Sequence, residues 1–187
     1  METFRSGNGA AWLDFMVTLS GRYRARPVDA LADPPALRAW LRANDLEPTA
    51  AVTADDLAGA LATREALHRL TVATLRGTAP AAGDVRTVAA ALAEDRPLHL
   101  APGGRLALRR PASVAEAVGR LVRDAVQDLA GPRRDELHAC GDDTCSGIFL
   151  DGTGRRRWCS DQTCGNRMRV RAHRAHRAGR DGAAASG

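Results

Sequence analysis

Hydrophobic side chains recur at helical spacing through the first 132 residues of the chain. Asp33-Pro34-Pro35 is typical of a helix start, with an N-cap followed by prolines in the first turn. The apolar residues behind it have the i, i+3, i+4 spacing of one buried helix face: Leu37, Trp40 and Leu41. A second helix is predicted from Thr53 to about Arg76 by a long leucine stripe. An earlier helix face is indicated by Trp12, Phe15, Met16 and Leu19.

Two more helices are predicted in this part of the chain. One covers Asp84 to Glu94. The other begins at Ser113, because Glu116 three residues later completes a capping-box pattern, and it ends at Gly131-Pro132. Its broad apolar face comprises Val114, Ala117, Val118, Leu121, Val122, Ala125, Val126 and Leu129.

A short stretch before this last helix has a different period. Residues 98–100 and 106–108 alternate apolar and other side chains around Ala101-Pro102-Gly103-Gly104, which predicts a β-hairpin. The predicted fold class is therefore α+β, mostly helical over residues 1–132 with a small β-hairpin.

Composition indicates a globular protein, and the distribution of charge indicates the kind of partner it binds. With 187 residues, 44% hydrophobic and 26% charged, the chain is long enough for one ordinary globular domain and a small appendage. All 27 basic residues are arginine, a bias typical of GC-rich bacterial genomes. Nine of them lie between Arg155 and Arg180 against one acid, Asp161, so this segment carries +8 while the remaining residues sum to −3. Such segregated charge indicates a polyanionic partner.

Membrane and enzyme classes receive no support. The apolar stretches are shorter than the roughly 20 residues of a membrane span, and the N-terminus lacks an apolar signal region, so we expect a cytoplasmic protein with no membrane partner. His68 lies among leucines and is predicted to be packed. Asp14 has no evident partner for acid–base work, and we find no nucleophile and base that would make an enzyme.

The four cysteines lie in the basic C-terminal part as two C-x4-C pairs separated by 13 residues. In a chain without a secretion signal, two close pairs favour a metal over disulfides, and zinc accepts four thiolates. The predicted metal ligands are Cys140, Cys145, Cys159 and Cys164. The alternatives are free or redox-active thiols, and substitution of a cysteine by a nearby ligand: His138, His173 or His176.

The sequence between the pairs predicts a hairpin that needs a metal. Ile148-Phe149-Leu150 reads as a strand, Asp151-Gly152-Thr153-Gly154 as a turn, and Arg157-Trp158-Cys159 as a return strand. So short a hairpin is unstable alone, and zinc binding can supply on the order of 10 kcal/mol. Phe149 and Trp158 would form its miniature core.

A cationic helix is predicted after Cys164. Met168, Ala172 and Ala175 share a face that could pack on the hairpin, while arginines occupy most of the remaining circumference. A solvated surface helix is the alternative, but from Cys164 to Arg180 there is no acid to balance the charge.

Arg157-Trp158-Cys159-Ser160 followed by Cys164-Gly165-Asn166-Arg167 resembles the CGNR zinc finger of bacterial transcription regulators. Weaker matches around Trp12 to Thr18, residues 37–41 and residues 64–67 resemble the ABATE domain, a stress-induced transcription regulator that precedes this finger. The resemblance implies zinc at the four cysteines and DNA binding by the C-terminal module. One departure is Val17, where the family usually has asparagine, and this puts any polar or ligand contact at that position in doubt.

The predicted organisation is an ABATE-like α+β domain (1–132), a CGNR zinc finger of hairpin plus helix (133–180) and a disordered tail (181–187). We expect a transcription regulator that contacts duplex DNA, with an N-terminal domain that senses or associates. The candidate DNA contacts are Arg155, Arg156, Arg157, Arg167, Arg171 and Arg174. Asn166 could read adenine, and more simply could support the local turn or the metal ligands.

Three other function classes stay open: an RNA-binding module, a protein-interaction finger and an enzyme in the N-terminal domain. The sequence also leaves open a homodimer, a small-molecule inducer, the DNA target, and whether the protein activates or represses. No heptad pattern demonstrates a dimer.

Overall fold

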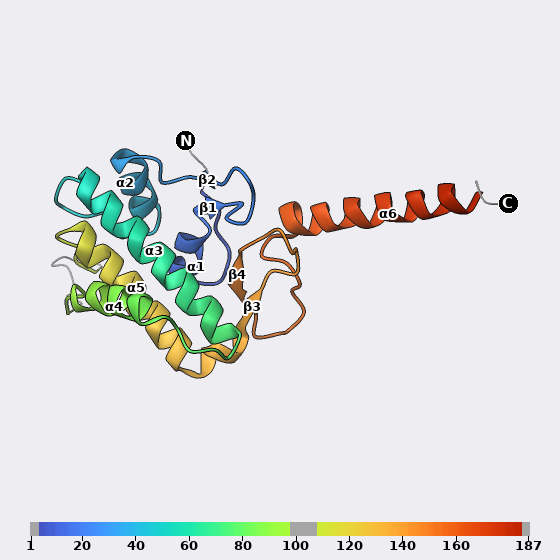
Figure 1. Ribbon diagram of the computed structural model, residues 1–187. Coiled ribbons are helices and arrows are strands. Elements are labelled where there is room, and N and C mark those ends of the chain that lie inside the picture. Colours follow the sequence, from blue (N-terminus) through green and yellow to red (C-terminus); the bar gives the residue numbers. More distant parts are fainter. Residues whose placement is uncertain (1–3, 98–107, 185–187) are drawn as a thin grey trace.

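The computed structural model describes residues 4–97 and 108–184 and is α+β, with a helical body, two small hairpins and a projecting C-terminal helix (Figure 1). The helices of the body are α1 (Ala11–Met16), α2 (Pro34–Ala43), α3 (Ala54–Leu75), α4 (Ala82–Ala93) and α5 (Val114–Ala130). The strands are β1 (Leu19–Ser20), β2 (Val28–Asp29), β3 (Leu137–Ala139) and β4 (Ile148–Leu150). The C-terminal part adds the short turns η1 (Pro132–Glu136) and η2 (Asp161–Gly165), then α6 (Asn166–Ala184).

The predicted helix starts are confirmed by their caps. The Asp33 carboxylate accepts the Ala36 N–H at 2.8 Å at the start of α2. Thr53 and Asp56 form a reciprocal capping box at the start of α3. Ser113 accepts the Glu116 N–H, but the Glu116 carboxylate accepts from the backbone of Ala112, one residue before the cap.

The core of the body lies where α1, α3 and α5 meet. Each of these helices contributes an almost fully buried side chain: Trp12 from α1, Leu67 from α3 and Leu121 from α5. Burial of the Trp12 indole leaves its Nε1–H in need of an acceptor, which the Asp128 carboxylate supplies at 2.7 Å. Val17 is only 5% exposed, so this position is filled by an apolar side chain packed in the interior.

The predicted hairpin at 98–108 lies outside the described residues except for Leu108. Within the described residues, the body instead contains the antiparallel pair β1–β2, in which Leu19 is opposite Asp29. Two-residue strands carry too few positions for an alternating pattern, so periodicity did not predict this hairpin.

In the C-terminal part β4 pairs with β3, with His138 opposite Phe149. The prediction of Arg157-Trp158-Cys159 as the return strand was wrong, because this segment is irregular, although its Arg157 carbonyl accepts the Gly141 N–H. The turn at Asp151-Gly152-Thr153-Gly154 is confirmed, since the Asp151 carboxylate accepts from both the backbone and the hydroxyl of Thr153.

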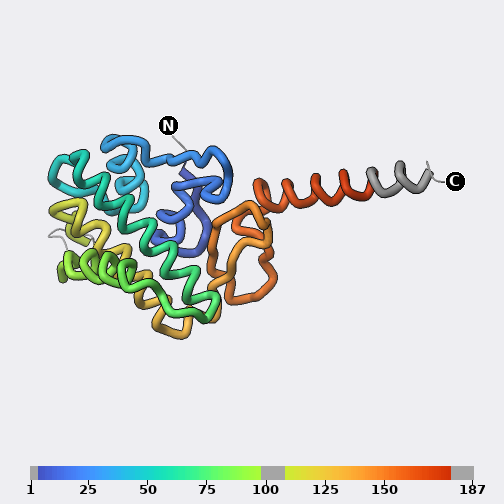
Figure 2. The backbone as a smooth tube through the Cα atoms, in the orientation of Figure 1, coloured from blue at the N-terminus to red at the C-terminus, as the bar shows by residue number. Residues whose placement is uncertain are grey.

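The hairpin β3–β4 is packed on the body, whereas α6 is not. Leu137, Ile148 and Leu150 belong to the main core, so the finger has one face buried against the body. Figure 2 shows α6 running away from the molecule, attached only at its first turns. It continues to Ala184, four residues into the segment predicted as a tail. Across the described residues, no helix combines the length and apolar character that crossing a bilayer requires.

Candidate metal centre and basic surface

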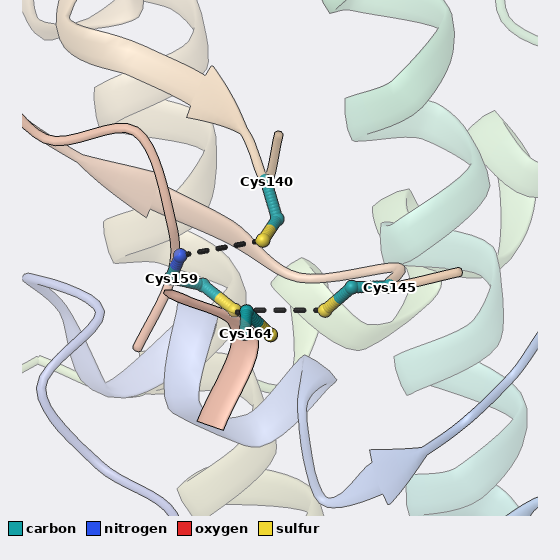
Figure 3. Close-up of side chains that lie close together, drawn as sticks. All are labelled: Cys140, Cys145, Cys159 and Cys164. Atoms are coloured by element: carbon teal, nitrogen blue, oxygen red, sulfur yellow. Dashed lines mark hydrogen bonds between the residues drawn. The ribbon is translucent and has the colours of Figure 1, made fainter. Parts of the chain in front are cut away.

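The sulfurs of the four predicted ligands point toward one another (Figure 3), and all four lie within 4.8 Å of each other. Cys140 follows β3, Cys145 lies in the loop before β4, Cys159 lies in the irregular segment, and Cys164 lies in η2. The Cys145–Cys159 and Cys159–Cys164 sulfur separations are 3.5 and 3.7 Å. The two C-x4-C pairs thus converge on one point.

The cluster fits a four-coordinate metal ion. Four sulfurs each about 2.3 Å from a central zinc lie about 3.8 Å apart in a regular tetrahedron, close to the separations found here. Hydrogen bonds from the Cys145 and Cys159 thiols lower the pKa of the Cys140 thiol to about 3. Hydrogen bonds from the Cys159 thiol to the Cys140 and Cys145 sulfurs, followed by burial, raise the pKa of Cys159. A cation is therefore what would allow all four sulfurs to be thiolates together.

Two glycines give the backbone room around the sulfurs. The Gly147 N–H donates to the Cys145 Sγ at 3.3 Å, and a Cβ on Gly147 would lie only 2.6 Å from the Cys159 Sγ. A Cβ on Gly165 would lie 2.5 Å from an Asp161 carboxylate oxygen. The same Cβ would lie 3.2 Å from a carbon of the Trp158 ring, so the glycine of the Cys164-Gly165-Asn166-Arg167 motif lets η2 pack closely against Trp158.

The predicted miniature core is confirmed. Phe149 is fully buried and packs with the cysteines, and Trp158 borders the same cluster. The Arg156 guanidinium stacks over the Phe149 ring at 4.6 Å from its centroid and donates to the backbone carbonyls of Gly7, Trp158 and Cys159. The structure therefore uses Arg156, a predicted DNA contact, to hold the finger together.

The N-terminal segment Phe4–Gly9 reaches the metal centre, a contact that the sequence did not predict. Arg5 donates to the Cys159 Sγ at 3.0 Å, and the Leu150 N–H of β4 donates to the Asn8 carbonyl at 2.8 Å. Asp14 anchors the segment, because its carboxylate accepts the backbone N–H groups of Gly7 and Asn8. A half-buried arginine beside a thiolate offsets part of the negative charge of the cluster.

Asp142, in the loop between Cys140 and Cys145, attaches α6 to the metal centre. Its side chain is fully buried and pairs with Arg167 at 2.5 Å and Arg171 at 3.3 Å. Burial alone would raise the pKa of Asp142, but hydrogen bonds from Thr144 and the two arginine charges outweigh it, and the pKa lies below its usual value. The carboxylate therefore stays ionised, and Arg167 and Arg171 are held in ion pairs.

The remaining predicted DNA contacts have fewer partners. Arg155 and Arg174 are exposed and form no ion pair with another described residue. Arg157 is exposed and lies 5.2 Å from the Trp158 ring. Asn166 is exposed at the start of α6, and within the described residues its side chain donates no hydrogen bond to a sulfur.

The face of α6 predicted to pack on the hairpin is mostly in solvent. Met168 is half-buried, but Ala172 and Ala175 are exposed, because the helix leaves the finger after its first turns. The packing prediction was therefore wrong beyond Met168. All nine side chains from Arg169 to Arg177 are exposed. Six of them are arginine or histidine, and the other three are Val170, Ala172 and Ala175.

Side chains of the body also contact the loop before β4. Arg22 donates to the Ser146 hydroxyl at 3.1 Å while pairing with Glu65, and the His68 ring lies 3.3 Å from the Ser146 carbonyl. Burial, followed by the charge of Arg22, lowers the pKa of His68 to about 4. His68 is packed, as predicted, and it links α3 to the finger. The signal in the sequence for this contact between body and finger was the arginine-rich run Arg22-Tyr23-Arg24-Ala25-Arg26.

Two protein families match the chain. A family described as "Putative stress-induced transcription regulator", ABATE, matches residues 9–138, and the CGNR zinc finger matches residues 136–177. The first covers more than half of the chain and the second contains all four cysteines. Among curated proteins, none matches this chain.

Proposed function

The chain belongs to the ABATE family of stress-induced transcription regulators and carries a CGNR zinc finger, and on that basis we propose that it is a zinc-dependent regulator that binds duplex DNA. The observation that supports this most directly is α6, a cationic helix that projects from a metal-stabilised base (Figure 1). An exposed helix of this diameter fits the major groove of B-DNA.

Zinc would be held by Cys140, Cys145, Cys159 and Cys164 in a structural role. Four protein ligands leave no open position for a substrate, so the ion supplies folding energy rather than chemistry. Zinc would fix η2, and thereby the first turn of α6, relative to β4. The Asp142 ion pairs then set the direction in which the rest of the helix leaves the finger.

The exposed arginines would supply the affinity for DNA. Arg174 on α6 and Arg155 and Arg157 beside the turn are exposed and could each neutralise a backbone phosphate and release counterions. Arg167, Arg171 and Arg156 would act mainly by holding the helix and the finger in place, since each is already engaged within the protein. The N-terminal body would sense a signal or associate with a partner.

The surface favours double-stranded DNA over single-stranded RNA. Proteins that read single strands stack bases on exposed aromatic rings. Both aromatic residues of the finger are used internally, because Phe149 is fully buried and Trp158 packs beside the cysteines.

Selection of bound sequences from a random duplex library at physiological salt tests the proposal. We expect an enriched motif whose affinity decreases steeply with salt. An Arg155→Ala/Arg157→Ala/Arg174→Ala variant should bind all duplexes more weakly, with a lower salt slope and unchanged zinc content. A parent protein that binds duplex DNA no better than it binds single-stranded RNA would contradict the assignment.

A further inference from the structure

A small polar cavity lies where the body meets the base of α6. It has a volume of about 130 Å³ and is lined by four arginines from three separate segments, together with Ser20, Thr144 and Cys145. Arg5 comes from the N-terminal segment, Arg24 and Arg26 from the β1–β2 connection, and Arg167 from the first turn of α6. At about 30 Å³ per water molecule, the cavity has room for a tetrahedral anion of phosphate size.

The charge of this cavity is not balanced by its own lining. Within the described residues no carboxylate lines it, although the cysteine cluster and Asp142 lie next to it. Those negative groups are already bound to Arg5 and Arg167, which donate to the Cys159 Sγ and to Asp142. Arg24 and Arg26 are exposed and form no ion pair with another described residue. Two guanidinium charges are therefore available to a ligand.

The β1–β2 connection holds Arg24 at the cavity. Gly21 adopts a positive φ of 64°, and its carbonyl accepts the Arg24 N–H at 2.8 Å, which closes a turn. The Arg24 side chain lies against Gly21, and its Nη2 is 3.5 Å from the Thr144 hydroxyl of the finger. A preorganised guanidinium loses less conformational entropy when it binds an anion.

We propose that this cavity binds a phosphate group of the DNA backbone, so that the ABATE domain contributes part of the DNA-binding surface. The inference rests on the proposed function. Arg24 and Arg26 would donate to the phosphate oxygens, and Arg167 would form the third side while keeping its bond to Asp142. Because Arg167 belongs to α6, the cavity is continuous with the helix, and DNA that contacts the base of α6 would bring its backbone to this position.

Paired variants separate this contact from general charge. Arg24→Ala/Arg26→Ala removes the two unpaired guanidiniums. Arg42→Ala/Arg86→Ala removes the same charge from exposed positions on α2 and α4, at the end of the body away from α6 (Figure 1). Affinity for a selected duplex and for an unrelated duplex is measured across a salt series, with zinc content and thermal stability recorded for each protein.

We expect the cavity variant to bind both duplexes about tenfold more weakly at physiological salt. The slope of log affinity against log salt concentration should decrease in magnitude by about 0.9, the value for one phosphate contact. Its zinc content should equal that of the parent, and the control should bind like the parent. Equal affinities for the two variants would overturn the inference while leaving the proposed function intact. A parent that binds no duplex would overturn the proposed function before any variant is compared.

Inorganic phosphate alone distinguishes the two sources of a phosphate group. If millimolar phosphate stabilised the parent but not the cavity variant, and both bound DNA equally, the cavity would serve a free phosphorylated ligand and its assignment to DNA would be overturned. Competition of phosphate with DNA in the parent, absent in the cavity variant, would support the assignment.

Discussion

Replacement of Asp142 by asparagine tests whether its ion pairs hold α6 to the finger. Asparagine keeps an oxygen that can accept from the Thr144 N–H and hydroxyl, which lie 3.0 and 2.8 Å from Oδ1 in the parent. It removes the charge that Arg167 and Arg171 face. Hydrogen bonds to buried charged groups contribute about 1.5–3 kcal/mol and exposed ion pairs about 0.2–1 kcal/mol. Because the two guanidiniums are partly exposed, we expect a loss near 1.5 kcal/mol, or about 3–6 °C in Tm.

Thermal unfolding of zinc-saturated protein measures this loss, with Asp143→Asn as the matched control. The Asp143 side chain is 82% exposed and, among the described residues, pairs with Arg171 alone, so its replacement should change stability by less than about 0.5 kcal/mol. Specific DNA affinity should fall in Asp142→Asn, because a helix with a looser attachment presents its arginines less precisely. A variant with unchanged Tm would refute the anchoring argument, and tighter specific binding would mean that Arg167 and Arg171 contact DNA once released.

Three further outcomes are expected. Purified parent should contain one zinc per chain, and metal analysis of Cys164→Ser should find it lost, because a hydroxyl does not replace a thiolate ligand. Gly147→Ala should weaken zinc binding about tenfold in a chelator competition, since its Cβ would lie 2.6 Å from the Cys159 Sγ, whereas Gly152→Ala, far from any sulfur, should not. His68 has a folded-state pKa of about 4, below its unfolded value of about 6.5, so the stability it contributes is complete above pH 6.5 and declines as pH falls toward 4. Urea unfolding should show about 2 kcal/mol more loss between about pH 7 and pH 5 in the parent than in His68→Gln, and equal losses would contradict a neutral buried imidazole.

Local signals in the sequence predicted the parts of the fold that depend on neighbouring residues. Asp33, Thr53 and Ser113 each mark a helix start because a cap is satisfied within three residues. The C-x4-C pairs predicted the sulfur cluster, since one metal ion determines where four ligands must converge whatever the chain does between them.

Contacts between segments far apart in the chain could not be predicted from the sequence. The partner of β4 was misidentified, because three-residue strands carry too little pattern to choose between β3 and Arg157-Trp158-Cys159. Charge counting treated the arginines as equivalent, whereas a single buried carboxylate, Asp142, separates Arg167 and Arg171 from exposed Arg174. Arg5 gave no signal at all, since its thiolate partner lies 154 residues away.

That separation has a consequence for the order in which the protein is assembled on the ribosome. Arg5 leaves the exit tunnel 154 residues before Cys159, so at elongation rates of about 5–20 residues per second it waits roughly 8 to 30 s for its partner. During this interval Asn8 also lacks the Leu150 amide that later donates to its carbonyl. The segment Phe4–Gly9 is therefore synthesised well before the residues that hold it in place. Nascent chains arrested before Cys159 should leave the segment Phe4–Gly9 sensitive to protease, and chains released with zinc should protect it.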